Sequence, residues 1–396
     1  MKHRIIVLGA GYAGAFSAGR LARQLHPDDV EITVVNAEPD FVERLRNHQA
    51  AAGQELPRRP LSKVFAGTGI RLKVARVARL DPDRRTVHVE DSLGTDTLEY
   101  DTLLYALGST VDDHGIPGVR EHAHHVATRP AALRLRERLD ELGDGGRVLV
   151  VGGNLTGIET ATELAESRPG LRIALATSGE LGGWLGDKAR RHLLRSFERF
   201  GIEVHEHAPI GRVEASAAIA ADGTVFDTDV TVWAAGFAAH PIAADSGLAV
   251  EENGQITVDR RMRSVSHPEV FAVGDSAFVI AENGKPLPMS CASAGPTSKQ
   301  AIAGIVGGLT GHEVSLTKFP YIGNHISLGR KDAIFQLVDG DAQAKPGAML
   351  GGSAAQVKTA ILKTAAWSVA HPTSGLPTRR HRSATAEDRT VRTLAA

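Results

Sequence analysis

The pattern of apolar residues predicts a strand, a glycine turn, a helix and a second strand at the start of the chain. The segments "RIIVLGAGYAG" and "EITVVNAE" carry near-continuous apolar runs, which are typical of parallel strands buried on both faces. Between them, Phe16, Leu21 and Leu25 recur at roughly helical spacing. The chain therefore opens with a βαβ unit.

A second βαβ unit begins with "GRVLVVGGNLTGIETATELAE" and continues through "LRIALATS", a helix around 187–201 and two more strands. Short alternating strands with turn signals separate the two units. This order predicts an α/β fold with two nested Rossmann-like domains plus a small C-terminal module. The expected bounds are 1–112 and 240–314 for the first domain, 113–239 for the second, 315–376 for the C-terminal module and 377–396 for a flexible tail.

Composition excludes several classes of function. The 45 basic and 46 acidic residues nearly cancel and only 5% of residues are aromatic, so we expect no nucleic-acid partner. The single cysteine, Cys291, rules out an internal disulfide and fits a reducing cytoplasm. His122, His124 and His125 lie close together without a nearby acidic or cysteine ligand, so we expect no metal site. No targeting segment is expected before the first strand, and no apolar run is long enough to span a bilayer.

The first glycine turn has the spacing of a dinucleotide site. Gly9, Gly11 and Gly14 follow the G-x-G-x-x-G pattern directly after a strand and open a helix. These glycines allow a tight turn, close approach of a pyrophosphate and close helix-to-strand packing. Asn36 stands at the end of the second strand, where a ribose acceptor is expected, and its amide can hydrogen-bond a diol.

Five motifs in order, "GAGYAG", "YALGS", "VVGGNLTGIE", "VWAAGF" and "VFAVGDSA", resemble the flavoproteins with two dinucleotide-binding domains. Within that superfamily the chain is most similar to the type II NADH dehydrogenases, which are NADH:quinone oxidoreductases. The resemblance implies bound FAD. It assigns contacts with the cofactor to Gly9, Gly11, Ala13, Gly14, Gly108, Gly274 and Asp275, with the Asp275 carboxylate accepting a ribityl hydroxyl.

A helix is expected to start near Pro296, with Thr297 and Ser298 in its first turn. By the resemblance, its positive end faces the flavin through backbone amides near Ser298, Lys299 and Gln300. The Lys299 side chain is either a catalytic residue that adds positive charge there or a solvent-facing lysine. The same resemblance places His48 at the front of the flavin, as a proton-transfer residue. A lone Cys291 cannot form a redox pair, and we interpret it as a small buried apolar residue.

The second glycine turn departs from the family pattern. Gly152 and Gly157 match, but Asn154 adds a side chain where the NAD(P)H pyrophosphate lies nearest. Because asparagine tolerates positive φ, we expect the turn to survive while binding of the cofactor weakens. Thr177 and Ser178 end the next strand without the charge that selects NAD or NADP, although Glu180 lies close by.

Glu159 follows the second glycine turn and has two interpretations. The resemblance places it near the flavin and the nicotinamide, as a polar anchor or proton carrier. In a helix first turn, an acidic residue is also favoured by the helix dipole alone.

The stretch 354–370 carries apolar residues at helical spacing, with Lys358 and Lys363 beside them. In type II NADH dehydrogenases the C-terminal region anchors the enzyme to the bilayer, and a basic amphipathic helix with Trp367 suits that role. Packing against the protein body explains the same stripe. The expected location is the cytoplasm, with peripheral contact at the inner face of the membrane as the alternative.

These observations favour an FAD-dependent oxidoreductase that moves hydride from NAD(P)H to flavin N5 and then to a quinone-like or other small acceptor. One alternative is a flavoprotein that oxidises a small organic substrate directly, without a nicotinamide. A second alternative is an FAD-binding redox sensor or interaction protein. The oligomeric state is left open.

Overall fold

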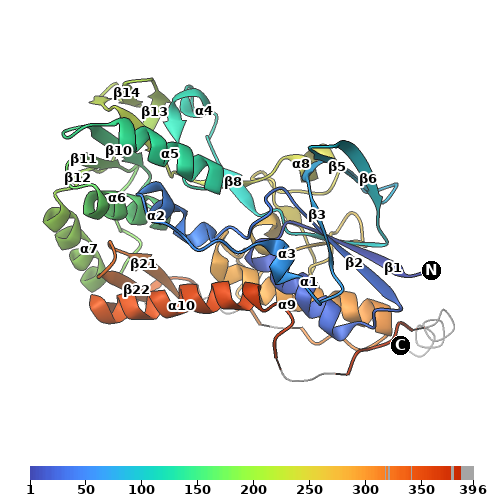
Figure 1. Ribbon diagram of the computed structural model, residues 1–396. Coiled ribbons are helices and arrows are strands. Elements are labelled where there is room, and N and C mark those ends of the chain that lie inside the picture. The colour runs from blue at the N-terminus through green and yellow to red at the C-terminus, as the bar shows by residue number, and fades with distance from the viewer. Residues whose placement is uncertain (317, 320–321, 340, 376–378, 385–396) are drawn as a thin grey trace.

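The computed structural model describes residues 1–316, 318–319, 322–339, 341–375 and 379–384. Two five-stranded parallel sheets form the two larger parts of the molecule, and a small antiparallel sheet with a long helix lies beside them (Figure 1). The predicted α/β class with two nested Rossmann-like domains is confirmed.

The first sheet has the strand order β19-β7-β1-β2-β3. Its strands are β1 (His3–Leu8), β2 (Val30–Asn36), β3 (Arg71–Val74), β7 (Thr102–Tyr105) and β19 (Val270–Ala272). Helices α1 (Tyr12–Gln24) and α9 (Cys291–Thr310) pack against each other beside it. An antiparallel sheet of β4 (Arg76–Asp81), β5 (Thr86–Asp91) and β6 (Gly94–Glu99) shares the same core.

The second sheet has the strand order β12-β11-β10-β16-β9. Its strands are β9 (Ala123–His124), β10 (Arg147–Val151), β11 (Arg172–Ala176), β12 (Glu203–His205) and β16 (Val230–Trp233). Its helices are α5 (Arg129–Glu141), α6 (Leu155–Ser167) and α7 (Asp187–Phe200). A three-stranded antiparallel sheet packs with this domain and consists of β13 (Ile210–Val213), β14 (Ala217–Ala220) and β15 (Val225–Asp227).

Two strands connect the domains, and they pair with each other. Strand β8 (Ser109–Val111) leads out of the first domain, and β17 (Phe237–Ala239) leads back antiparallel to it. The shorter elements are α2 (Asn47–Ala51), α3 (Leu61–Val64), α4 (Val119–His122), α8 (Ile242–Asp245), β18 (Ile256–Thr257), β20 (Ala277–Phe278) and the 3₁₀ turns η1 (Arg44–Arg46) and η2 (Gly274–Ser276).

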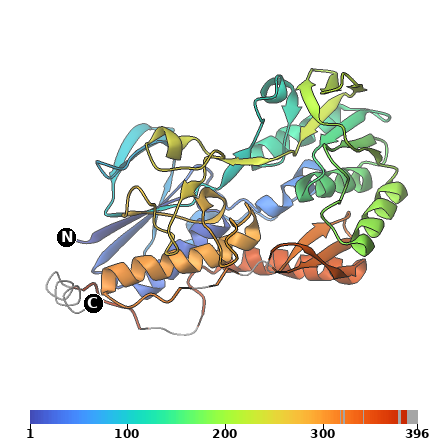
Figure 2. The same ribbon diagram turned by 180° about the vertical axis from the view of Figure 1, so that it is seen from behind.

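The C-terminal module bridges both domains. It consists of β21 (Gly323–Ser327), β22 (Ala333–Val338), β23 (Ala344–Leu350) and the helix α10 (Gly352–Ala370). Helix α10 contacts α1 of the first domain, while β21 contacts α6 of the second. In the view from behind, the red helix lies along the second domain, and its C-terminal end reaches the first domain (Figure 2). Among the described residues, no helix is both long enough and apolar enough to cross a membrane.

The flexible tail predicted from residue 377 is wrong for 379–384. The N–H of His381 donates to the carbonyl of Gln24 at 2.7 Å, and Arg382 pairs with Asp29 at 2.9 Å. This segment therefore lies against the end of α1, where polar residues find partners that composition alone does not reveal. The rest of the predicted tail, 377–378 and 385–396, lies outside the described residues.

The predicted start of the helix near Pro296 is also wrong. Helix α9 begins at Cys291, so Pro296 is its sixth residue. A proline inside a helix removes one backbone hydrogen bond, which is why a start at the proline was expected. Helix α9 packs against α1, and it contains Pro296 in its interior although proline is locally disfavoured there.

Candidate functional site

The first glycine turn has the geometry of a pyrophosphate cradle. Gly9 has φ +91°, and a Cβ atom there would lie 2.4 Å from the carbonyl oxygen of Ala106. A Cβ on Gly14 would lie 1.9 Å from the oxygen of Gly9. At Gly11, by contrast, a Cβ would meet no protein atom within 4 Å. Gly11 therefore faces open space at the N-terminus of α1, where an anion is favoured.

Asn36 supports this turn from the end of β2. Its Oδ1 accepts from the N–H of Ala10 at 2.8 Å, and its Nδ2 donates to the carbonyl of Glu38 at 2.7 Å. Both polar atoms of the carboxamide are thus used within the protein. A ribose hydroxyl at this place would have to share Oδ1, which has a second lone pair.

Asp275 forms a second wall of the same site. Its Oδ2 accepts from the Ser109 hydroxyl at 2.7 Å, and its Oδ1 has no partner among the described residues. The preceding Gly274 has φ +64° and approaches Ala13, because a Cβ there would lie 3.3 Å from the Ala13 side chain. The N–H of Gly108 donates to Ser276 Oγ at 2.9 Å, which holds this loop against Asp275. A free carboxylate oxygen beside an open glycine turn fits FAD, with Asp275 available to a ribityl hydroxyl.

Helix α9 starts earlier than predicted, so different residues form its N-terminal end. The amides of Ser298, Lys299 and Gln300 lie inside the helix, so their predicted contact with the flavin from its N-terminus is wrong. Ser298 and Gln300 are fully buried, and Lys299 is exposed. The first residue, Cys291, is exposed and not buried as predicted. The amides of the exposed residues Cys291 and Ala292, at the start of α9, therefore replace those of 298–300 as candidates to face the flavin.

Glu159 lies at the junction of three parts of the fold. Its Oε1 accepts from Lys358 Nζ of α10 at 2.8 Å and from the N–H of Ser327 in β21 at 2.8 Å. Lys358 also donates to the carbonyl of His325 at 2.9 Å. Burial raises the pKa of Glu159, but Lys358 and the Ser327 N–H outweigh burial and hold that pKa below its usual range. The carboxylate is thus kept charged inside the protein.

His48 lies close to this ion pair. Burial lowers its pKa, and the negative charges of Glu159 and Glu163 oppose that effect. Its Nε2 is buried without a hydrogen-bond partner among the described residues. The structure therefore brings together His48 and Glu159, two of the three predicted catalytic residues, whereas Lys299 points to solvent.

The sequence prediction did not include the basic partner of Glu159. The stripe that includes Lys358 is compatible with membrane contact or with packing against the protein body, and the Lys358 side chain is only 14% exposed. Helical spacing places Lys358 on the same face as Ala354 and Leu362, and Ala354 is buried. A lysine on a buried apolar stripe needs an anionic partner. The position of Lys358 on this stripe was therefore the sequence feature that could have indicated a buried acidic partner.

The second glycine turn has the same backbone conformation as the first, but the Asn154 side chain lies in it. Asn154 caps α6 with φ −85° and ψ −178°, close to the −72° and −166° of Gly11 at the start of α1. The expected positive φ at Asn154 is therefore wrong, because its backbone is extended and not left-handed. The Asn154 Oδ1 accepts from the N–H of Gly157 at 3.1 Å, and its Nδ2 donates to the carbonyl of Ala234 at 2.7 Å. The space that is open beside Gly11 is filled here by a carboxamide.

Glu180, the acidic residue nearest the end of β11, pairs with Arg190 at 3.3 Å. Thr177 is buried, and its Oγ1 lies where a Cβ on Gly153 would come within 2.5 Å. A ribose at this edge would meet a threonine and an acid that already has a cationic partner.

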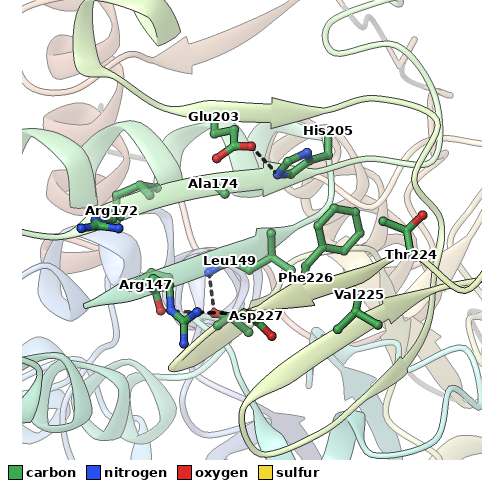
Figure 3. Close-up of a pocket in the computed structure, with 13 residues that line it drawn as sticks. Arg147, Leu149, Arg172, Ala174, Glu203, His205, Thr224, Val225, Phe226 and Asp227 are labelled. Atoms are coloured by element: carbon green, nitrogen blue, oxygen red, sulfur yellow. Dashed lines mark hydrogen bonds and ion pairs between the residues drawn. The ribbon is translucent and has the colours of Figure 1, made fainter. Parts of the chain in front are cut away.

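A cavity of about 510 Å³ opens elsewhere in the second domain. It lies between the amino ends of β10 to β12 and strand β15, and its wall includes Arg147, Arg172, His205 and Phe226 (Figure 3). Dinucleotides bind at the carboxyl ends of parallel strands, so this cavity lies at the wrong edge for that role. Among the described residues, no group of His, Cys, Asp and Glu is placed to hold a metal ion.

Comparisons with known proteins agree with this geometry. Residues 3–298 match the family model of the pyridine nucleotide-disulphide oxidoreductases. An NADH dehydrogenase-like protein of Mycobacterium tuberculosis is 28% identical over 357 residues, which are 84% of this chain and 87% of the relative. The type II NADH:quinone oxidoreductase of Staphylococcus epidermidis is 25% identical, covering 88% of this chain and 93% of that protein.

Two solved structures share the fold. The NDH2 of Plasmodium falciparum in complex with NADH has a TM-score of 0.78 at 14% identity, covering 94% of this chain and 97% of that one. The sulfide:quinone oxidoreductase of Aquifex aeolicus also has a TM-score of 0.78, at 21% identity, covering 93% of this chain and 92% of that one. The chain belongs to the pyridine nucleotide-disulphide oxidoreductase family and is an FAD-dependent oxidoreductase with a small-molecule electron donor and acceptor.

Proposed function

We propose that this protein transfers electrons from NAD(P)H to a quinone-like acceptor. The observation that carries the proposal is the buried pair of Glu159 and Lys358, near the start of α9 and the FAD site. A quinone reduced by two electrons also takes up two protons. Protonation of a quinone inside the protein needs ionisable groups that are shielded from bulk water, and this pair provides them.

Each part of the chain has a proposed task. Residues 1–112 and 240–314 hold FAD, which supplies a two-electron acceptor at its N5 atom. Residues 113–239 hold the nicotinamide donor, and residues 315–376 complete the acceptor side. The hydrogen bond from Lys358 to Glu159 holds a proton, and we propose His48, whose pKa responds to the charge of Glu159, as the group that replaces that proton.

A second candidate function is favoured by Asn154. Its carboxamide takes the hydrogen bond of Gly157 N–H and occupies the position that stays open in the FAD turn. A protein with this turn closed would oxidise a small organic substrate directly and would bind NAD(P)H weakly. The FAD turn is the same in both functions, whereas only the first function gives the Glu159–Lys358 pair a role, in protonating the acceptor.

One experiment separates these two functions. The purified yellow protein is mixed anaerobically with NADH or NADPH while the flavin absorbance is followed. Rapid bleaching, followed by recovery of the absorbance when a short-chain quinone is added, is the result expected from the proposal. If millimolar nicotinamide leaves the flavin oxidised, the first function fails. Organic substrates are then screened for bleaching in the same assay.

We propose peripheral membrane contact through α10 as a separate point. Ile361 and Trp367 are 37% and 53% exposed, and Lys363 of the same helix is also exposed. With Lys358 turned inward, the outer face carries less positive charge than predicted. Co-sedimentation with vesicles of mixed neutral and anionic lipids tests the contact. Trp367→Ala should weaken it several-fold, while Trp184→Ala, on the second domain, should not.

A further inference from the structure

Arg44 lies on the wall of the FAD site and has no role in the function proposed so far. It begins the 3₁₀ turn η1, and its Nη1 donates to the Ser109 carbonyl at 2.5 Å. Its Nη2 donates to Ser109 Oγ at 2.9 Å. The same hydroxyl donates to Asp275 Oδ2. One serine thus connects the guanidinium to the carboxylate that faces the ribityl chain.

The charge of Arg44 is poorly balanced. No carboxylate among the described residues lies within 4 Å of it, unlike its neighbours in sequence. Arg46 and Arg59 pair with Glu43, and Arg58 pairs with Asp40. Arg44 instead lies 5.2 Å from the centre of the Phe237 ring, and Asp275 acts on it only at longer range.

Arg44 is largely but not completely buried beside the FAD site. Burial lowers its pKa, yet solvent still reaches part of the side chain. A Cβ on Gly108, in the loop beside Asp275, would lie 3.7 Å from Arg44 Nη1. A cation that is largely desolvated and without a paired anion favours the binding of negative charge next to it.

We propose that the Arg44 guanidinium stabilises the negatively charged, two-electron-reduced form of the flavin and so raises its reduction potential. This inference rests on the FAD site of the proposed function, but not on which donor or acceptor is used. A cation that served only the pyrophosphate would act equally on both redox states, because the phosphate charge does not change. The reduction potential therefore separates the two roles.

The test is an anaerobic equilibrium between the FAD-loaded protein and a two-electron redox dye, without any nicotinamide. Arg44→Met removes the charge and keeps much of the side-chain volume. It should shift the equilibrium about tenfold toward oxidised flavin, which corresponds to ~30 mV for a two-electron couple. Arg44→Lys keeps the charge and should shift it less than threefold. Arg58→Gln removes an arginine whose side chain is 70% exposed, and it should leave the equilibrium unchanged.

Two outcomes would overturn the inference. In the first, Arg44→Met retains FAD and its equilibrium with the dye stays within twofold of the wild type. In the second, Arg44→Met and the milder Arg44→Gln both lose oxidised FAD while Arg44→Lys retains it, which would assign the charge to binding of the oxidised cofactor. Because the dye replaces the donor, failure of NAD(P)H to bleach the flavin affects neither result.

Discussion

Lys358 Nζ lies 2.8 Å from Glu159 Oε1 and joins helix α10 of the C-terminal module to helix α6 of the second domain. The two residues are 199 positions apart in the chain. Their side chains are only 14% and 10% exposed, so each depends on the other for its charge to be tolerated. The pair therefore links the docking of α10 to the ionisation of the predicted catalytic acid.

Lys358→Met should destabilise the protein by about 3–5 kcal/mol, because it leaves a buried carboxylate unpaired. It should also raise the pKa of Glu159, since burial then acts without its main opposing charge. Urea unfolding measures the loss of stability. The double variant Glu159→Gln/Lys358→Met should recover a large part of the lost stability.

Lys363→Met, on the exposed side of the same helix, is the matched control and should change stability by no more than about 0.5 kcal/mol. Equal losses in the two single lysine variants would contradict this account.

Asn154→Gly should tighten NAD(P)H binding about ten- to hundredfold, because it removes the carboxamide and frees the Gly157 N–H. The helix cap lost with it costs only a few tenths of a kcal/mol when glycine replaces asparagine. Titration of the protein with NADH and NADPH measures the two dissociation constants. Thr128→Gly removes a comparable cap from α5 in the same domain and should leave both constants unchanged. An Asn154→Gly protein with wild-type affinity would show that the asparagine does not obstruct the site.

Gly11→Asn tests the same relationship in the first domain. Its backbone has φ −72°, and the added Cβ would meet no protein atom within 4 Å, so the fold should persist. The carboxamide would occupy the space assigned to the FAD pyrophosphate, and the flavin content per chain should fall at least tenfold. Gly143→Asn, at another position with open space, should keep its full flavin content. Full flavin content in both variants would contradict the assignment of the space beside Gly11 to the FAD pyrophosphate.

His325 should make stability depend on pH in the acidic range. Burial, with Lys358 next, lowers its pKa to about 4, whereas a histidine in the unfolded chain titrates at about 6.5. As the pH falls from about 6.5 to about 4, the unfolded chain takes up a proton that the folded protein refuses, so stability decreases. His325→Phe, which keeps the ring next to Phe335, should show a smaller decrease in the midpoint of thermal unfolding over that range. His122→Gln, at an exposed position, should follow the wild type. Parallel curves for His325→Phe and the wild type would refute the assignment.

The sequence alone determined the features that depend on residues close to one another along the chain. Apolar runs followed by Gly9, Gly11 and Gly14 require a tight turn, because a Cβ at the first or third glycine would strike the backbone. The same reasoning identified the second turn and its asparagine. The order of the motifs was sufficient to predict the family, the α/β class and FAD.

Only the tertiary structure decided how distant residues share charge. The partner of Glu159 lies on the last helix, and the proximity of His48 depends on how α2 packs against α6. The start of α9 at Cys291 and the contacts of 379–384 with α1 also depend on packing that local preferences do not contain. The physical reason is that a buried charge or an irregular helix is tolerated only where long-range contacts compensate for its cost. Local sequence patterns carry no record of those contacts.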